Sequence, residues 1–413
     1  MEESGGGESL EKVRKLKPSP RRKTDAAGTS RLFADAAELS KLVDPMEPVF
    51  CFSAERLRQR IGEFLTGFPG DVAYAVKANP GEHVLLTASA CGLTLFDVAS
   101  VHEMKHVRAI APRARFHYHN PVKSRAEIEE AHHVYGCTRF AADDLQEIYK
   151  ITHTLGRATG IEIAIRFRLP RLGGSSAHDF SSKFGATRPE TVELLKSVTA
   201  LGFTPVLTFH PGSQCTDPLA YVRHISAAAK IARRAGVKLK ALNVGGGFPA
   251  RYRNEMVPPL SIFFQAIGEA NRKEFGSHAP GLECEPGRGI VAPSTSLLTR
   301  IKLVKHNRNE VFINDGVYGA LMEVYQVPDI VPPARAIRDG KELVGPTRPW
   351  TVYGPTCDPL DKLPVKFELP VDIREGDFVE FGSIGAYGAA TSTRFNGYGG
   401  APTYFVRDVL SAS

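Results

Sequence analysis

Residues 188–246 contain the pattern that decides the fold: RPETVELLKSVTALG (188–202), PVLTFH (205–210), AYVRHISAAAKIARRAG (220–236) and KLKALNVGG (238–246). The first and third segments carry apolar residues at helical spacing and end in Gly, a common helix stop. The second and fourth are short apolar runs of the kind that form buried strands. Because strands that alternate with helices are joined by crossover connections, these strands are predicted to pair in parallel.

The same alternation starts near Arg31 and runs to about residue 293. Further strands are predicted at DVAYAV (71–76), RFHYHN (115–120), GIEIAIRF (160–167) and LECEPG (282–287), and a further helix at SRAEIEEAHHVYG (124–136). Strand and helix alternating over about 240 residues match the size of a (β/α)8 TIM-like barrel. A doubly wound sheet is the alternative.

After Pro293 the pattern changes to short strand-like segments with Gly and Pro turns and without a convincing long helix. This texture predicts a C-terminal antiparallel β domain. The expected organisation is a disordered basic tail (1–30), an N-terminal segment that joins the β domain (31–52), the barrel (53–293) and the β domain (294–413). The strand-like segments are SLLTRIKLVKH, EVFINDG, WTVYGP, KFELPVDI, DFVEFGS and PTYFVRDVL.

Composition excludes several classes of protein. The chain has 413 residues, of which 42% are hydrophobic and 23% charged, as in globular proteins. No apolar run is long enough to span a membrane, and the N-terminus lacks a secretory signal pattern. Part of the net charge of +7 lies in KVRKLKPSPRRK (12–23), which is typical of a solvated tail. Without interleaved aromatic residues elsewhere, this run does not predict nucleic-acid binding.

The six cysteines are spread along the chain, with no CxxC pair and no Cys–His spacing typical of zinc, so no metal site is predicted. We interpret them as reduced thiols in a cytoplasmic protein. They are Cys51, Cys91, Cys137, Cys215, Cys284 and Cys357.

Four motifs follow predicted barrel strands, at the end where barrel enzymes place their active sites. In YAVKANP, burial at the strand end is expected to lower the pKa of Lys77 and make it a Schiff-base former, although a lysine at a strand end can also simply extend into solvent. In NVGGGFP, the glycines Gly245, Gly246 and Gly247 allow backbone N–H groups to approach an anion, or form a tight turn.

The other two motifs carry charged and polar groups. EPGRG supplies Glu285, Gly287 and Arg288, which can hold a pyridinium nitrogen and a phosphate, or form a surface ion pair. FHPGSQ supplies His210 and Ser213. A single His in an apolar strand is more often a satisfied core residue, but here a Gly-Ser pair follows it, as a phosphate-binding turn requires.

Taken together, the motifs resemble the fold-type III pyridoxal-phosphate (PLP) enzymes, and in particular the ornithine/diaminopimelate decarboxylase family, closest to the ornithine/lysine decarboxylases. The resemblance runs from about Phe33 to the C-terminus, and the motifs occur in the order found in the family. They are YAVKANP, FDVAS, SSKFGA, HPGSQ, GGGFP, EPGR, GPTCDPLD and GAYG.

The resemblance implies pyridoxal 5'-phosphate as the cofactor, Lys77 as the residue that carries it and His210 as the residue that stacks on its ring. It places Asp97 and Glu103 on the wall around Lys77, and Arg166 near the ring oxygen. Glu285 is expected to keep the ring nitrogen protonated, which favours decarboxylation, since alanine racemases place an arginine there. The phosphate ligands implied by the resemblance are Ser213, Gly245, Gly246, Gly247, Gly287, Arg288 and Tyr387.

In GPTCDPLD the resemblance implies that Cys357 and Asp358 reach into the site of a partner subunit, which predicts a homodimer with shared active sites. Cys357 is expected to protonate the carbon that loses carbon dioxide, and Asp358 to bind the distal amine of the substrate. A buried core thiol is the alternative for Cys357. Diaminopimelate decarboxylases usually read CES here, so Cys-Asp favours a substrate with a plain distal cation.

One departure concerns NDGVYGALMEVYQVPD (314–329). Where eukaryotic ornithine decarboxylases place a second distal-amine aspartate, this chain has Val327 on an ungapped count. Asp329 follows two residues later and Glu323 lies earlier. In GPTCDPLD, Pro359 also stands where the eukaryotic motif commonly has Gly, a change expected to affect the turn more than the chemistry.

Three hypotheses follow. The first is decarboxylation of L-ornithine, with L-lysine as a further substrate, as in polyamine biosynthesis. The second is decarboxylation of another cationic or modified amino acid, such as arginine, a diaminopimelate-like compound or a natural-product precursor. The third is a non-catalytic regulator of the antizyme-inhibitor type, against which the retained Lys77, Glu285, Arg288 and Cys357 argue. Neither nucleic acid nor a membrane is expected as a partner.

Overall fold

The computed structural model describes residues 31–156, 158–170, 183–253 and 255–412. The basic run 12–23, for which the sequence predicts a disordered tail, lies outside these residues. None of the described helices combines the length and apolar character needed to cross a membrane. All six cysteines are free thiols.

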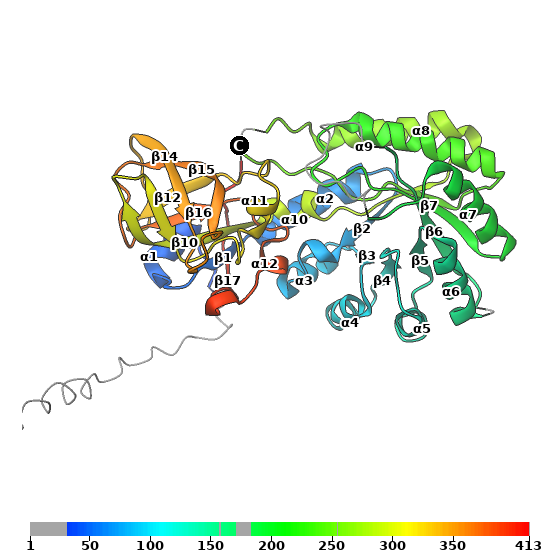
Figure 1. Cartoon of the computed structure of the whole chain (residues 1–413), viewed down its shortest axis with the longest axis horizontal. Helices are drawn as coiled ribbons and strands as arrows, with labels where there is room; N and C mark the ends of the chain where they lie inside the picture. The colour runs from blue at the N-terminus through cyan, green and yellow to red at the C-terminus, as the bar shows by residue number, and fades with distance from the viewer. Residues whose placement is uncertain (1–30, 157, 171–182, 254, 413) are drawn as a thin grey trace, which may run out of the picture. The chain divides into compact units, whose positions relative to one another are not determined.

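Eight parallel strands close into a barrel, in the order β2 to β9 (Figure 1). Each strand pairs with the next along the chain, and the ring closes where Asp71 and Val72 pair with Glu283 and Cys284. The closed ring confirms the predicted barrel and rules out the doubly wound alternative. The strands are β2 (Asp71–Ala75), β3 (Leu95–Val98), β4 (Arg115–Tyr118), β5 (Arg139–Ala142), β6 (Glu162–Arg166), β7 (Thr204–Thr208), β8 (Ala241–Asn243) and β9 (Gly281–Cys284).

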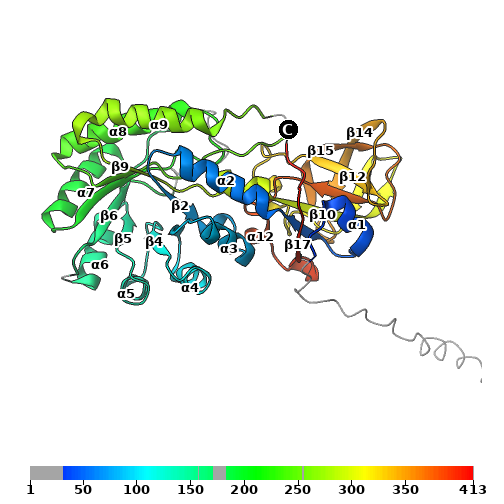
Figure 2. The same cartoon turned by 180° about the vertical axis from the view of Figure 1, so that it is seen from behind.

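Helices cover the outside of the barrel (Figure 2). Their ends follow local sequence signals: Ser124 and Glu127 form a capping box at the start of α5, and Gly236 ends α8 with a φ of 68°. The helices around the barrel are α2 (Ala54–Gly67), α3 (Glu82–Ala90), α4 (Val101–Ile110), α5 (Arg125–His133), α6 (Leu145–Leu155), α7 (Arg188–Ala200), α8 (Pro218–Ala235) and α9 (Leu260–Phe275).

Strands β3 and β5 were missing from the predicted set. Both have only four residues, and β5 starts with the buried Arg139, so neither presents a long apolar run. Inside the barrel, the Arg139 guanidinium donates to Glu283 at 2.6 and 3.0 Å and pairs with Glu162. These two carboxylates compensate the buried charge, which explains why an arginine is tolerated in a barrel strand.

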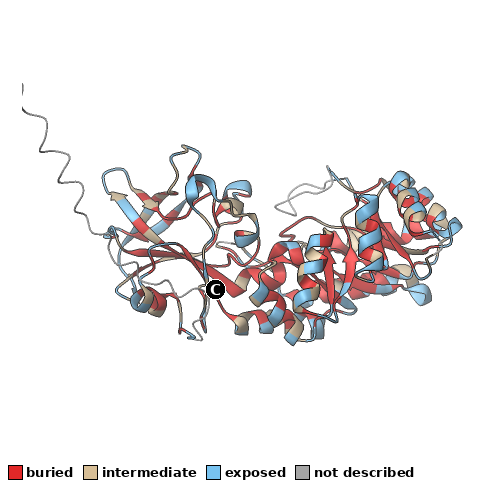
Figure 3. Cartoon of the chain, turned by 90° about the horizontal axis from the view of Figure 1, so that it is seen from below, coloured by how far each residue is buried: buried red, intermediate tan, exposed pale blue. Residues whose placement is uncertain are grey.

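The barrel is filled by side chains and places its polar groups at the strand ends. A small cluster inside it consists of Ala141, Ala164, Val206 and Ala241. Buried residues follow the barrel strands, whereas exposed residues gather on the outer faces of the helices (Figure 3). The cavity described below is lined by residues at the carboxyl ends of the strands, the end where barrel enzymes place their active sites.

The second domain is a nine-stranded sheet in the order β13-β12-β16-β10-β11-β14-β15, with β1 beside β10 and β17 beside β1. Most pairs are antiparallel, as predicted, but β1–β17 and β11–β14 are parallel. The strands are β1 (Val49–Phe52), β10 (Thr295–Lys305), β11 (Glu310–Ile313), β12 (Ala334–Arg338), β13 (Lys341–Glu342), β14 (Thr347–Tyr353), β15 (Lys362–Pro370), β16 (Phe378–Phe381) and β17 (Thr403–Phe405).

The pairing of β1 with β10 brings the segment before the barrel into this sheet. The predicted domain boundaries themselves stay predictions. Helices in the β domain are short, in line with the sequence pattern. They are α1 (Ala36–Val43), α11 (Met322–Gln326) and α12 (Gly388–Thr391), and α10 (Arg288–Val291) lies at the junction after β9.

Candidate active site

A cavity of about 380 Å³ brings together residues from the barrel strand ends and from the β domain. It contains two carboxylates among its described lining residues, Asp97 and Glu323, and three cations, Lys77, Lys183 and Arg288. The other lining residues are Val98, Ala99, His119, Asn120, Pro121, Phe184, Ser213, Gln326, Tyr387 and Thr391.

Lys77 lies two residues beyond the end of β2, in a 3-10 turn (Val76–Ala78) that directly follows this strand. Its side chain is about half exposed, at 49%, and its Nζ lies 3.8 Å from Oδ2 of Asp97. Burial lowers the pKa of Lys77, but Asp97, with Tyr387 and Glu285, raises it by more. The pKa therefore lies above its ordinary value, and the lowered pKa expected from the sequence is wrong.

Asp97 and Glu103 have different positions around Lys77. Asp97 lies in β3, and burial, reinforced by the nearby charge of Glu285, raises its pKa to about 7 although Lys77 opposes this. The ion pair with Lys77 is thus only partly formed near neutral pH. Glu103 accepts a hydrogen bond from the backbone N–H of Ala99 at 2.6 Å and stabilises the start of α4.

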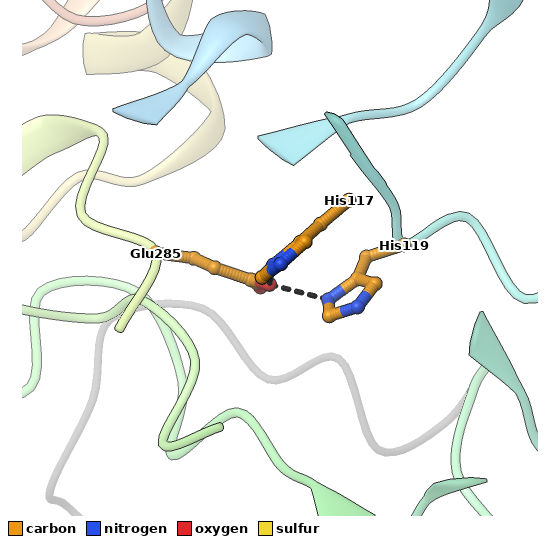
Figure 4. Close-up of side chains that lie close together, drawn as sticks. All are labelled: His117, His119 and Glu285. Atoms are coloured by element: carbon orange, nitrogen blue, oxygen red, sulfur yellow. Dashed lines mark ion pairs between the residues drawn. The ribbon is translucent and has the colours of Figure 1, made fainter. Parts of the chain in front are cut away.

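Glu285 is held by groups in or directly after two barrel strands, β4 and β8, and Figure 4 shows the two histidines of the first. Its Oε1 is in ion-pair contact with Nδ1 of His119 and accepts a hydrogen bond from Nδ2 of Asn243 at 2.6 Å. Nδ1 of His117 lies 4.0 Å from the same oxygen. Burial opposes ionisation, but His119, with Lys77 and Asn243, lowers the pKa of Glu285 to about 2. The Glu285 carboxylate is therefore ionised at neutral pH, at the carboxyl end of β9.

His117, His119 and Glu285 are also side chains of the kinds that bind metals, and their ligand atoms lie within 4.8 Å of one another. Two features favour hydrogen bonding over a shared ion. The Asn243 amide already donates to Oε1 of Glu285, and Lys77 acts on this carboxylate as a nearby positive charge. The absence of a metal stays a prediction.

His210 and Arg166 lie at neighbouring strand ends, on the loop after β7 and at the end of β6. Nδ1 of His210 accepts a hydrogen bond from the backbone N–H of Gly212 at 3.0 Å. Burial, together with the nearby charges of Arg166 and Lys77, holds the pKa of His210 well below its usual value. The imidazole is therefore neutral at physiological pH and suited to stack on an aromatic ring. Arg166 lies 5.5 Å from the ring centroid of Phe184.

The Gly-rich loop after β8 packs closely against two other loops. A Cβ on Gly246 would lie 2.7 Å from the carbonyl oxygen of Glu285 and 3.1 Å from Nε2 of His210. Gly247 has a φ of +89°, a conformation that side chains other than glycine rarely adopt. Larger residues are excluded here by contact as well as by conformation. Gly245, with a φ of +70°, belongs to the same tight loop, for which the sequence predicts a phosphate site.

Arg288 is almost fully buried and forms several contacts in addition to that with Ser213. Its Nε and one terminal nitrogen donate to Oγ of Ser213 at 3.3 Å. Its other terminal nitrogen donates to the Tyr252 hydroxyl at 2.7 Å and to Oε2 of Glu323 at 2.8 Å. Neither Tyr252 nor the pairing with Glu323 was predicted. Arg288 also lies 5.2 Å from the ring centroid of Tyr387.

Tyr387 has a left-handed backbone with a φ of 61°, which is uncommon for an aromatic residue and typical of functional positions. Its N–H donates to the carbonyl of Ala78 at 2.8 Å, directly after Lys77. The β domain thereby places the Tyr387 side chain in the cavity beside Arg288. Gly287 lies at the same junction, where a Cβ would approach that of Ala78 to 2.8 Å.

Cys357 and Asp358 are not among the described residues that line the cavity. Cys357 is exposed, and its Sγ lies 3.5 Å from Oδ1 of Asn396. Asp358 accepts hydrogen bonds from the Leu360 backbone N–H and the Tyr318 hydroxyl, both at 2.8 Å. These bonds, that from Leu360 first, lower the pKa of Asp358. Both side chains are thus presented at the surface of the β domain.

Helix α11 settles which residue of the NDGVYG segment enters the cavity. Val327 is 3% exposed and packs into the barrel-side core, so this position contributes no polar group. Asp329 is exposed and is not among the described lining residues, whereas Glu323, one helical turn before Val327, lines the cavity. The acidic side chain that this helix presents to the cavity is therefore Glu323, one turn before the position that the resemblance indicates.

The residues of this cavity fit the expected cofactor. A lysine amine, an ionised carboxylate, a neutral imidazole and a glycine-lined arginine site are the groups that bind an aldehyde, a pyridine nitrogen, an aromatic face and a phosphate. Sequence reasoning missed His119 and His117 within this set. The alternation in RFHYHN was the available signal, because residues two apart in a strand face the same side.

Comparisons with known proteins agree with this geometry. The family described as pyridoxal-dependent decarboxylase, pyridoxal binding domain, matches residues 54–292. A lysine/ornithine decarboxylase of Selenomonas ruminantium is 30% identical over 345 residues, which cover 82% of this chain and 84% of that protein. A chloroplastic ornithine decarboxylase of Nicotiana glauca is 31% identical over 375 residues, covering 87% and 83%. The solved arginine decarboxylase of Paramecium bursaria Chlorella virus superposes with a TM-score of 0.79 at 26% identity, covering 90% of this chain and 99% of that one.

Proposed function

This chain belongs to the pyridoxal-dependent decarboxylases, and on that premise we propose that its main substrate is L-ornithine and that it also accepts L-lysine. It is a PLP-dependent carboxy-lyase of basic amino acids. Pyridoxal phosphate, when bound, supplies the electron sink that stabilises the negative charge left as carbon dioxide departs. The choice of substrate follows two of the relatives, one of which is a lysine/ornithine decarboxylase and the other an ornithine decarboxylase.

The observation that carries the proposal is the constellation around Lys77. We assign Lys77 to the cofactor aldehyde, Glu285 to the ring nitrogen and His210 to the ring face. Ser213, Arg288, Tyr387 and the loop 245–247 are assigned to the phosphate. Asp97 and Arg166 complete the wall. Support for these assignments comes from the cavity lining, which includes Lys77, Asp97, Ser213, Arg288 and Tyr387, and from the contact of Glu285 with the lining residue His119.

A substrate with a distal cation needs a carboxylate, because a buried ammonium without a partner is costly. Within the chain, Glu323 is the candidate that lines the cavity. In the structure it pairs with Arg288. If Arg288 held the cofactor phosphate, the positive charge of Arg288 would be shared between that phosphate and Glu323, and the Glu323 carboxylate would be able to accept an incoming ammonium.

A second carboxylate is proposed to come from another copy of the chain. Cys357 is exposed and Asp358 is half-buried on the β domain; neither is among the described lining residues of the cavity, and the motif implies a role in catalysis. We therefore propose a homodimer in which each copy contributes these two residues to the site of the other. In this arrangement Asp358 binds the distal amine, and Cys357 returns a proton to the α-carbon.

The substrate assignment is tested by carbon dioxide release from L-ornithine, L-lysine, L-arginine, meso-diaminopimelate and the uncharged L-norvaline. We expect release from ornithine and lysine and none from diaminopimelate, whose second carboxylate would be repelled. Robust activity on diaminopimelate, or release only from arginine, would contradict the assignment. Release from none of the five would contradict the basic-amino-acid activity itself.

Two variants test the acidic groups. Asp358→Ala should lower kcat/KM on ornithine by about a hundredfold, the scale of a charge that loses its partner, and should affect norvaline far less. Glu323→Gln should act in the same direction, with the affinity for pyridoxal phosphate measured alongside to separate an effect on Arg288. Glu368→Ala, an exposed carboxylate on β15, serves as the matched control. Unchanged kcat/KM in Asp358→Ala would show that the distal amine is bound elsewhere.

A further inference from the structure

His119 is a buried cavity residue for which the motifs assign no role. It follows β4 directly, is 9% exposed, and lines the cavity that contains Lys77. Figure 4 shows its ring beside the Glu285 carboxylate, with Nδ1 toward the carboxylate oxygen. Both of its ring nitrogens are buried without a hydrogen-bond partner among the described residues, and Nδ1 is in ion-pair contact with Glu285 alone. An unpartnered buried nitrogen at a cavity wall is a reason to look for a function.

We propose that His119 is a positioning residue that keeps Glu285 ionised and turned toward the pyridine nitrogen of the cofactor. This inference rests on the proposed cofactor role of Glu285 and adds a residue to it. Three observations support this proposal: the contacts of Oε1 of Glu285, the stacking of His117 on His119, and the effect of His119 on the ionisation of Glu285.

The first observation concerns the oxygen that His119 contacts. Oε1 of Glu285 faces Nδ1 of His119 and also accepts from Nδ2 of Asn243 at 2.6 Å. Oxygen Oε1 is therefore engaged by nitrogen groups from β4 and β8, on opposite sides of β9 around the closed barrel. Two fixed contacts on one oxygen set the plane of the carboxylate. Oε2 is then the oxygen that can accept from a third donor, the protonated ring nitrogen.

His117, the neighbour of His119, has a different place beside the carboxylate. The rings of His117 and His119 are stacked, with centroids 5.1 Å apart and an angle of 22° between the planes. Burial, with the charge of Arg139 added, holds the pKa of His117 well below its usual value, so His117 stays neutral. It lies 4.0 Å from Oε1 and supports the His119 ring without contacting the carboxylate closely.

The third observation is electrostatic. Burial alone would favour the protonated, neutral form of Glu285, in which it could no longer stabilise a pyridinium. His119 is the largest single influence that offsets this burial. The ionisable groups that act on His119 are Glu285, His117 and Asp97, from β9, β4 and β3. Without His119, Glu285 should become harder to ionise in the acid range.

The experiment uses the full chain and compares His119→Leu, His119→Asn and wild type. Asn retains an N–H donor near the position of Nδ1, whereas Leu does not. The apoprotein is titrated with pyridoxal phosphate between pH 5.5 and 8, and each affinity is divided by the wild-type value at the same pH. This ratio removes the titration of the phosphate itself. His83→Leu, at a half-buried imidazole that is not among the described lining residues of the cavity, is the matched control.

For His119→Leu we expect the relative affinity to fall about fivefold or more from pH 8 to pH 5.5, as Glu285 takes up a proton. His119→Asn should restore the part of the loss that depends on the N–H donor, and His83→Leu should show no such trend with pH. With ornithine, His119→Leu should lower kcat about tenfold, the effect of one lost hydrogen bond to a charged group, with KM nearly unchanged.

A relative affinity that is independent of pH, or a loss that His119→Asn does not repair, would overturn the positioning role and leave only a packing role. The cofactor titration involves no substrate, so it stands even if no amino acid in the panel is decarboxylated. Failure of the proposed function and failure of this inference are therefore distinguishable.

Discussion

Replacement of Glu285 by glutamine tests the electrostatic core of the site. The side chain is only 10% exposed, and its pKa is lowered from an ordinary 4.5 to about 2. At about 1.4 kcal/mol per tenfold change in the ionisation constant, the site stabilises the carboxylate relative to the carboxylic acid by roughly 3 kcal/mol more than water does. The amide in Glu285→Gln has nearly the same shape but cannot carry this charge.

If that preference stabilises the protonated ring nitrogen during decarboxylation, Glu285→Gln should lower kcat by about a hundredfold. The assay is steady-state carbon dioxide release from ornithine, with cofactor absorbance to confirm that the variant is loaded and circular dichroism to confirm that it is folded. Glu285→Asp keeps the negative charge on a shorter side chain, and its kcat should lie between that of wild type and that of Glu285→Gln. A fully loaded Glu285→Gln enzyme with kcat within about threefold of wild type would refute the reasoning.

Two further predictions concern assembly and pH. Mixing inactive Lys77→Ala and Cys357→Ala subunits should restore about a quarter of wild-type activity, because half of the dimers are then mixed and each has one intact site; no recovery after verified subunit exchange would contradict shared sites. The pKa of Asp97 is raised to about 7 by burial, so the folded apoprotein holds a proton there that the unfolded chain loses near pH 4. Its contribution to stability should therefore fall as the pH rises from about 4 to about 7, and the Tm of the wild-type apoprotein relative to Asp97→Asn should decline over that window; a constant difference would show that Asp97 is not perturbed.

The sequence predicted the barrel because its strands and helices have different periods and strong stop signals. Helix α8, with Asp217 at its start and Gly236 at its end, shows how clear those signals are. Strand β5 escaped prediction because its four residues, RFAA, offer only three apolar positions, two of them alanines. The burial of its first residue, Arg139, depends on Glu162 and Glu283, from β6 and β9, and such pairing cannot be read from a local pattern.

The candidate site was predicted in the same uneven way. Glycines and charged residues in tight motifs, such as Arg288, could be found because the motif order is specific. The direction in which the pKa of Lys77 shifts could not be predicted. It depends on Asp97, which lies 3.8 Å from Lys77, and this distance is set only when the barrel closes. Glu323 was named but not assigned, since its access to the cavity depends on the short helix α11 that buries Val327.

The most direct test of the account is to identify the lysine that carries the cofactor. Borohydride reduction of the loaded enzyme, followed by peptide mapping, fixes the pyridoxyl group on its lysine. Two lysines, Lys77 and Lys183, line the cavity among the described residues, so the result discriminates between real alternatives. The account predicts a single pyridoxyl group on Lys77, and a label on Lys183 or on any other lysine would contradict it.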